Sequence, residues 1–171
     1  MPAPSLHPAQ LPVDRLLADC ELQRTRRSGP GGQHRNKVET AVVITHVPTG
    51  TTAEASERRS QEENKAVAVF RLRMRLALDL RIPCPGNAAP SLLWQTRCRG
   101  GKISVNSEHS DFPALVAEAL DLLHAQNYDL KATASILECT TSQLIKFLQQ
   151  EPRAMLVVNA ERERNGLHRL K

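Results

Sequence analysis

The pattern of hydrophobic and polar residues in the first third of the chain predicts strands. The run ETAVVITHV (Glu39–Val47) is rich in β-branched residues, and TTAEAS follows it after the turn VPTG. In that turn Pro48 fixes φ at the second position and Gly50 stands at the fourth. We therefore predict a hairpin over residues 39–56, preceded by a short helical turn in VDRLLADCEL and a weaker strand at Cys20–Arg26.

The next segment opens with a helix start signal. The residues SQEE (Ser60–Glu63) form a capping box, in which the Ser hydroxyl accepts from the third amide and the Glu side chain reaches back. Apolar residues then alternate strictly from Phe70 to Leu80, which by itself is a strand pattern. The cap, the Ala and Leu content, and a run longer than a usual strand favour a helix over about Gln61–Leu80.

Prolines and a glycine interrupt the pattern at IPCPGNAAPS (Ile82–Ser91). The following stretches, LLWQTRC and KISVNS, are predicted as two short strands that form a hairpin around Arg99–Gly101. DFPALVAEALDLLHA is predicted as an amphipathic helix, with Asp111 as its cap and Pro113 in its first turn.

The remaining residues have a helical pattern. In Leu130–Leu148 two helices are predicted on either side of Cys139–Thr141, with apolar spacing typical of a helix-turn-helix, although Glu138 stands where such motifs often have glycine. A third helix starts at Pro152 and ends near Asn165–Gly166. This region is either a cap that only packs or a nucleic-acid-binding module.

Together these patterns predict an α+β fold: a small mixed or antiparallel sheet with packed helices and an exposed loop, plus an all-helical extension. The expected organisation is a flexible lead-in over 1–11, a domain over 12–126 and a helix-turn-helix-like extension over 127–171.

Composition narrows the classes of partner. The 171 residues carry a net charge of +5 with a pI of about 9.3, which favours a polyanionic partner. Aromatic residues make up 3%, too few for a binder of single strands built on stacking. The four cysteines form no C-x-x-C pair, so we expect reduced thiols and no metal site. No membrane span or targeting segment is predicted, and we expect a cytosolic protein.

The segment RRSGPGGQHRNK (Arg26–Lys37) concentrates glycine and positive charge around one neutral amide. Gly31 and Gly32 permit backbone conformations that point successive N–H groups into one concavity. Gln33 can hold or orient water without changing charge. The spacing is neither that of a P-loop nor that of a dinucleotide-binding fingerprint. A surface loop without a role is the alternative.

The sequence of this segment and of the residues that follow it resembles that of a known protein family. SGPGGQHRNKVETAVVITHVPTG, followed by ERRSQEENKAVAV, resembles the catalytic domain of class I peptide-chain release factors and of the small ribosome-rescue peptidyl-tRNA hydrolases. The marker is Gly31-Gly32-Gln33, with Ser28-Gly29 before it and Asn36 after it. The likeness is close over about residues 18–82 and looser onward to about 126.

The resemblance implies hydrolysis of the peptidyl-tRNA ester in the peptidyl-transferase centre of the ribosome, without a cofactor. The backbone N–H of Gln33 would stabilise charge in the transition state, and its side chain would admit only water-sized groups. Gly31 and Gly32 would set the backbone path.

Gln33 is also a candidate for methylation by a glutamine methyltransferase. His34 is the titratable group beside Gln33, and we expect it to contact RNA rather than act as a base. The expected RNA contacts are Arg26, Arg27, His34, Arg35, Lys37, Arg58, Arg59 and Lys65.

Two departures from the family shape the functional expectation. We expect no codon-reading domains within 171 residues, and the end NAERERNGLHRLK is not a long basic tail. The prediction is codon-independent peptidyl-tRNA hydrolysis on stalled ribosomes. One alternative is a non-catalytic RNA- or DNA-binding protein that uses residues 130–165. Another is hydrolysis of free peptidyl-tRNA.

Overall fold

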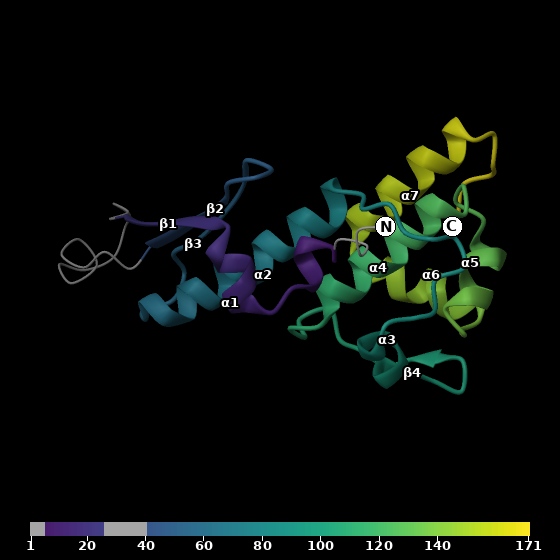
Figure 1. The fold of residues 1–171 in the computed structure, drawn as a ribbon, viewed down its shortest axis with the longest axis horizontal. Helices are drawn as coiled ribbons and strands as arrows, with labels where there is room; N and C mark the ends of the chain where they lie inside the picture. Colours follow the sequence, from purple (N-terminus) through teal and green to yellow (C-terminus); the bar gives the residue numbers. More distant parts are fainter. Residues whose placement is uncertain (1–5, 26–40) are drawn as a thin grey trace. The chain divides into compact units, whose positions relative to one another are not determined.

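The computed structural model describes residues 6–25 and 41–171. Their Cα positions divide the chain into two compact units, one over Leu11–Leu76 and the other over Ala77–Lys171 together with the segment up to Gln10. Helices and small antiparallel sheets are both present, so the predicted α+β class is confirmed (Figure 1). The expected domain boundaries at residues 12 and 126 stay a prediction.

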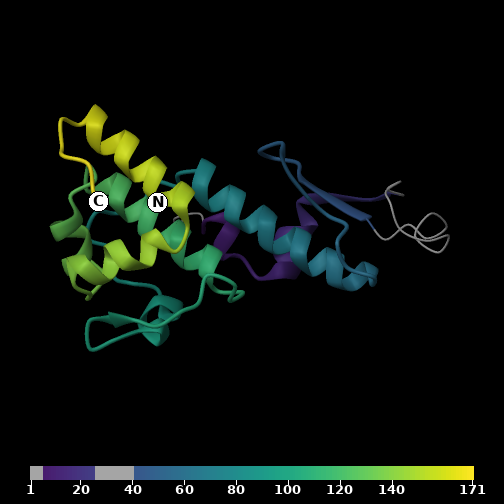
Figure 2. The same ribbon diagram turned by 180° about the vertical axis from the view of Figure 1, so that it is seen from behind.

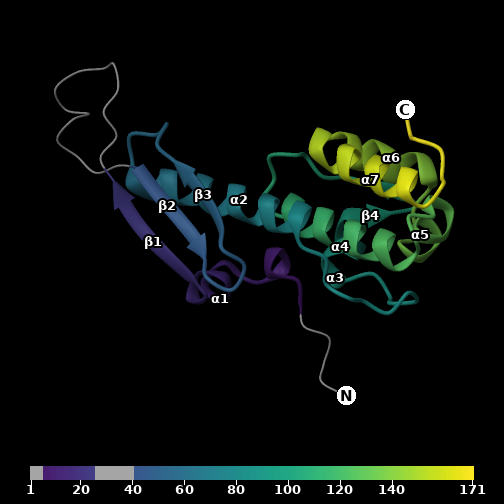
Figure 3. The ribbon, with the colours of Figure 1, turned by 90° about the horizontal axis from the view of Figure 1, so that it is seen from above.

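The first unit is built on a three-stranded antiparallel sheet. Its elements are α1 (Val13–Ala18), β1 (Cys20–Thr25), β2 (Ala41–His46), β3 (Thr51–Ala55) and the greater part of α2 (Gln61–Asp79). The strand order is β1-β2-β3, so β2 is central (Figure 3). The predicted strands and hairpin are confirmed. In the turn, Gly50 takes a φ of +68°, and its N–H donates to the carbonyl of His46 at 2.8 Å.

Helix α2 crosses one face of this sheet in Figure 3, which explains the ambiguous apolar pattern. On the sheet, the buried residues Ile44 and Ala53 are cross-strand partners. On the helix, Ala68, Leu72 and Leu76 are fully buried at four-residue spacing, while Met74 and Leu78 form a second buried stripe. Two adjacent helical stripes therefore produced the alternation from Phe70 to Leu80, and the predicted helix is confirmed.

Two arginines of α2 close the outer edge of β3. Arg71 donates to the carbonyl of Glu54 at 2.8 Å, and Arg75, one turn later, donates to the carbonyl of Thr52. Alternate carbonyls of an edge strand point away from the sheet and can template pairing with another chain. The two guanidinium groups occupy these carbonyls, so this edge of the sheet is covered.

The second unit is mainly helical and surrounds α4 (Phe112–Ala125), whose residues from Phe112 to Ala117 are all buried (Figure 2). It also contains η1 (Pro8–Gln10), α3 (Leu92–Arg97), β4 (Cys98–Arg99), β5 (Lys102–Ile103), α5 (Leu130–Ile136), α6 (Thr141–Gln149) and α7 (Pro152–Arg164). Helix α4 packs against η1, α5 and α7. The predicted β-hairpin around Arg99–Gly101 and the four helices from α4 onward are confirmed.

The strand predicted at LLWQTRC is wrong, because residues Leu92–Arg97 form α3. The side chain of Ser91 caps this helix by accepting from the N–H of Trp94 at 3.0 Å. The Trp94 ring is buried against Phe147, with ring centroids 5.7 Å apart. Its indole N–H donates to the carbonyl of Leu137 at 2.8 Å. A partner 43 residues away thus stabilises a helix that the local pattern does not favour.

The cap predicted at Asp111 is only partly correct. Asp111 stands at the N-cap position of α4 and Pro113 lies in the first turn, but the Asp111 side chain makes no capping hydrogen bond. Its carboxylate instead accepts from Arg97, with the Nη2 and Oδ2 atoms 2.6 Å apart. The ion pair with a cation at the end of α3 outcompetes the local amide.

Helices α5 and α6 have the predicted helix-turn-helix spacing. Ala134, Leu137, Leu144 and Phe147 are buried. Glu138, at the position where such motifs often have glycine, adopts a left-handed φ of +53°. The turn therefore keeps the glycine-like backbone although the residue is not glycine.

Candidate functional site

The predicted catalytic residues Gly31, Gly32 and Gln33 lie outside the described residues, and so does Gln33 as a modification candidate. The same holds for the expected RNA contacts Arg26, Arg27, His34, Arg35 and Lys37. The described residues on either side of this segment are Thr25, which ends β1, and Ala41, which begins β2. These two residues are direct partners in the antiparallel register. The segment 26–40 therefore joins two strands at a fixed end of the sheet.

The same end of the sheet leads into the turn before α2. Because Val42 pairs with Ala55, strand β3 ends beside the start of β2, and residues 56–60 leave from that end. Arg58 and Arg59 are both exposed in this turn. Arg24, opposite Val42 on β1, is a third exposed cation near that end, and it was not among the contacts predicted from the sequence. The register thus brings together the anchors of segment 26–40 and three arginines.

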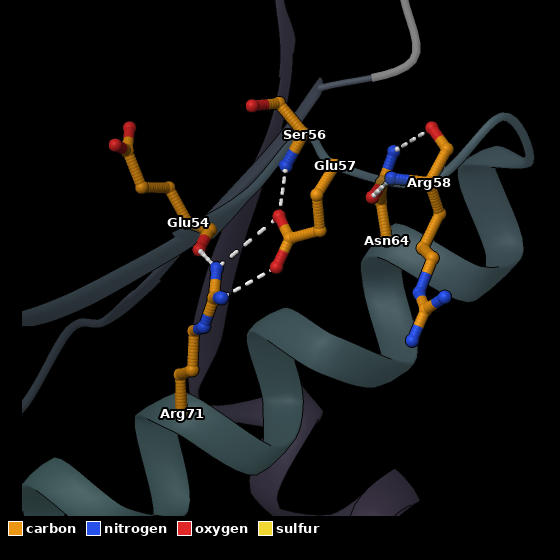
Figure 4. A network of polar contacts seen from close by, with 6 residues as sticks. All are labelled: Glu54, Ser56, Glu57, Arg58, Asn64 and Arg71. Atoms are coloured by element: carbon orange, nitrogen blue, oxygen red, sulfur yellow. Dashed lines mark hydrogen bonds and ion pairs between the residues drawn. The ribbon is translucent and has the colours of Figure 1, made fainter.

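Asn64 builds the turn that carries Arg58. Its amide side chain is fully buried, accepts from the N–H of Arg58 at 2.9 Å and donates to the carbonyl of Arg58 at 3.0 Å (Figure 4). The backbone N–H of Asn64 donates to the Ser60 carbonyl at 3.1 Å, which starts α2. One bond of the predicted capping box is present, from the Glu63 N–H to Ser60 Oγ at 3.4 Å.

The side chains of Arg58 and Arg59 are exposed. In Figure 4 the Arg58 guanidinium lies away from the carboxylate of Glu57. Lys65 follows Asn64 on α2 and is half-buried, so it is less accessible than Arg58 and Arg59. No role for Asn64 was predicted from the sequence. An asparagine just after a capping box was the available signal, because Asn is not favoured inside a helix without a specific bond.

Glu57 is the acidic residue of the turn, and its charge is compensated. The backbone N–H of Ser56 donates to its carboxylate at 2.8 Å, and Arg71 from α2 forms an ion pair with it. The hydrogen bond from Ser56 and then the pairing with Arg71 hold the pKa of Glu57 below its ordinary value. Glu57 is therefore anionic at neutral pH but bound by Arg71, so Arg58 and Arg59 remain available to an external anion.

In the described parts of the chain, no group of three or more His, Cys, Asp or Glu residues could hold a metal ion. Within residues 6–25 and 41–171, no helix has the length and apolar character needed to cross a membrane.

Comparison with known proteins assigns the class of this domain. Residues 13–83 match the family model of the RF-1 domain. This range contains the sheet, the segment 26–40 and helix α2. Residues 13–83 thus match a domain of the class I release factor type.

A particular relative supports the same assignment. The chain is 50% identical over 64 residues to peptide chain release factor 1 of Ruthia magnifica subsp. Calyptogena magnifica. The aligned part is 37% of this chain and 18% of the release factor, so the chain spans less than a fifth of that protein's length.

Proposed function

We propose that this protein hydrolyses the ester of peptidyl-tRNA on stalled ribosomes, in the cytoplasm and without reading a stop codon. The observation that carries the proposal is the position of Gly31-Gly32-Gln33 inside the RF-1 domain match, in the segment that joins the paired residues Thr25 and Ala41. The partners are peptidyl-tRNA and the RNA of the peptidyl-transferase centre.

The chemistry needs no ionisable side chain from the protein. Water attacks the ester carbonyl, the carbonyl oxygen gains negative charge, and the ester bond to the tRNA 3′ oxygen breaks as that oxygen takes up a proton. A backbone N–H at Gln33 directed at the developing oxyanion lowers the barrier, and one such donor contributes about 10²–10³ in rate. The Gln33 side chain restricts access to water, and its amide is the site for a glutamine methyltransferase.

The cations around the loop bind the RNA that surrounds the ester. Arg58 and Arg59 are exposed next to the anchors of segment 26–40, and Glu57 is already paired with Arg71. Arginine binds phosphate through two parallel hydrogen bonds, which fixes position as well as adding affinity. Arg24, Arg58 and Arg59, together with the half-buried Lys65, therefore form the described part of the proposed RNA contact.

The test is peptide release from ribosomes that carry labelled peptidyl-tRNA. Ribosomes on truncated mRNA are compared with ribosomes that hold a stop codon in the A site. We expect release from the truncated complex. Gly32→Ala should reduce release by about 10²-fold or more, because it displaces the backbone N–H of Gln33. Gln33→Ala keeps that N–H but should also lose release, because the side chain that restricts access to water is removed. Gln23→Ala is the matched control, because Gln23 is exposed on β1 and has no proposed role.

Release that is insensitive to both loop substitutions would contradict the proposed site. Release that requires a stop codon would contradict codon independence alone.

A second candidate function is a non-catalytic nucleic-acid-binding protein, which is favoured by the helix-turn-helix geometry of α5 and α6. Binding of ribosomes without any release of peptide would support that candidate. Release that persists when ribosomes are omitted would instead point to hydrolysis of free peptidyl-tRNA.

A further inference from the structure

The hairpin of β4 and β5 places two cations directly opposite each other. Arg99 and Lys102 are cross-strand partners, joined by a two-residue turn in which Gly100 and Gly101 have φ of +57° and +76°. Positive φ at both central positions is the conformation that gives the tightest hairpins, and glycine adopts it without strain. Both cationic side chains are exposed.

This arrangement does not stabilise the fold. Like charges at directly opposed positions of two strands repel each other. Other arginines of the same unit pair with carboxylates: Arg97 with Asp111, Arg153 with Glu151, and Arg169 with Glu163. Within the described residues, the side chains of Arg99 and Lys102 have neither a hydrogen bond nor an ion pair. Two adjacent exposed cations without an internal counterion are suited to an external anion.

The hairpin is attached to the start of α6. The N–H of Thr140 donates to the carbonyl of Gly101 at 3.4 Å, and Gly101 forms an isolated bridge with Cys139. Strand β5 packs against α6. The hairpin that carries Arg99 and Lys102 and the second helix of the helix-turn-helix, α6, are therefore held together as one surface.

The exposed side of α6 is polar and carries no acidic residue. Ser142, Lys146 and Gln149 are exposed there, while Leu144, Phe147 and Leu148 face the core. Side chains with hydroxyl, amide or ammonium groups contact the phosphate and sugar oxygens of nucleic acids. The acidic residues that flank α6 in the sequence are Glu138, in the turn before it, and Glu151, which pairs with Arg153.

We propose that this hairpin–helix surface, made of Arg99, Lys102, Ser142, Lys146 and Gln149, binds the sugar–phosphate backbone of double-stranded RNA. The choice of RNA rests on the proposed function, because the same chain carries an RF-1 domain. A single strand would need exposed aromatic rings for stacking. The aromatic residues of this unit, Trp94, Phe112, Tyr128 and Phe147, are all buried. The surface therefore recognises the sugar–phosphate backbone of the duplex and brings the RF-1 domain to RNA.

The experiment measures binding of the full chain to a 20-base-pair RNA duplex and to a DNA duplex of the same sequence, at several salt concentrations. The test variant is Arg99→Ala/Lys102→Ala. The matched control is Arg153→Ala/Arg169→Ala, which removes the same charge from two exposed arginines that already have partners. Circular dichroism confirms that each variant is folded.

We expect the wild type to prefer RNA and the test variant to bind it about 10-fold or more weakly. Its log–log salt slope should be shallower by about 2, because two phosphates are no longer neutralised by the protein. The control should behave as the wild type. Equal binding by the test variant and the control, or a preference of the wild type for DNA, would overturn the proposal.

Peptide release separates this proposal from the proposed function. Gln33→Ala should bind the duplex normally while losing release. Arg99→Ala/Lys102→Ala should need a higher protein concentration for release but reach the same maximal rate. Hairpin-dependent RNA binding by a wild type that releases no peptide would refute the hydrolase function and leave the RNA surface standing.

Discussion

The amide side chain of Asn64 holds the backbone of Arg58 at both ends, accepting from its N–H at 2.9 Å and donating to its carbonyl at 3.0 Å. A buried residue of α2 thus fixes the conformation of an exposed turn six residues earlier. The turn lies at the end of the sheet from which segment 26–40 leaves, so Asn64 is a positioning residue for the candidate site.

Replacing Asn64 tests this role. Asn64→Ala leaves the N–H and the carbonyl of Arg58 without their partner, and an unpaired polar group that is shielded from water costs about 1–3 kcal/mol. We expect the free energy of unfolding to fall by about 2–3 kcal/mol, measured by urea denaturation followed by circular dichroism. Glu63→Ala, at the adjacent exposed position, should change it by less than about 0.5 kcal/mol. An Asn64→Ala protein as stable as the wild type would contradict the assignment.

The arginines that cover β3 should protect against association. Arg71→Ala/Arg75→Ala frees the carbonyls of Glu54 and Thr52 at the edge of the sheet. We expect self-association at high protein concentration in analytical ultracentrifugation and a loss of about 1–2 kcal/mol in stability. Arg58→Ala/Arg59→Ala removes the same charge from side chains that bind no strand carbonyl, and it should stay monodisperse. If both variants associate equally, lost charge rather than an open edge is the cause.

Replacing Glu138, the residue of the helix-turn-helix with a left-handed backbone, should increase the stability of the protein. Glu138 has a φ of +53°, where a side chain is strained and glycine is not. Glu138→Gly should therefore stabilise the protein by about 0.5–1 kcal/mol in spite of the greater freedom of glycine in the unfolded chain. Ser135→Gly, exposed within α5, should destabilise it by several tenths of a kcal/mol, because a helix penalises glycine. The thermal midpoints of the two variants should move in opposite directions.

Two buried groups of the second unit should make opposing contributions to the pH dependence of stability. Burial lowers the pKa of His7 to about 4, so as pH falls from about 6.5 to 4 the unfolded chain binds a proton first and stability is lost. Burial raises the pKa of Asp121 to about 6, so as pH falls from about 6 toward 4 the folded chain binds the proton first and stability is gained.

Single substitutions should separate these contributions. Relative to the wild type, His7→Gln should become more stable as pH falls from 6.5 to 4, and Asp121→Asn should become less stable from 6 to 4. Urea denaturation at pH 7, 5.5 and 4 measures both. The fluorescence of Trp94, the single tryptophan and a buried residue of the same unit, reports the transition. Parallel stability curves for the three proteins would contradict both assignments.

Local patterns were sufficient for most elements of the fold. The β-branched residues of AVVITH, the Pro48–Gly50 turn and the Ser60 cap act within a few residues, and each predicted its element correctly. The helices from α4 onward were likewise predicted from their periodicity and, for α4 and α7, from the prolines at their starts. The sequence also supplied the Gly31-Gly32-Gln33 hypothesis, because that motif is local; its geometry stays a prediction.

Contacts between residues that are distant in the sequence determined the features that local patterns did not predict. Trp94 folds into a helix instead of a strand because its indole meets Leu137, 43 residues away, and Asp111 turns from its own helix to Arg97. The attachment of the cationic hairpin to α6 likewise depends on contacts that no local pattern encodes. The sequence by itself determined the strands and most of the helices, through short-range propensity and capping. The type of domain was indicated by the resemblance that the Gly31-Gly32-Gln33 motif carries. Only the tertiary structure decided which exposed cations stand without an internal partner, because ion pairing depends on distances that folding creates between residues far apart in the chain.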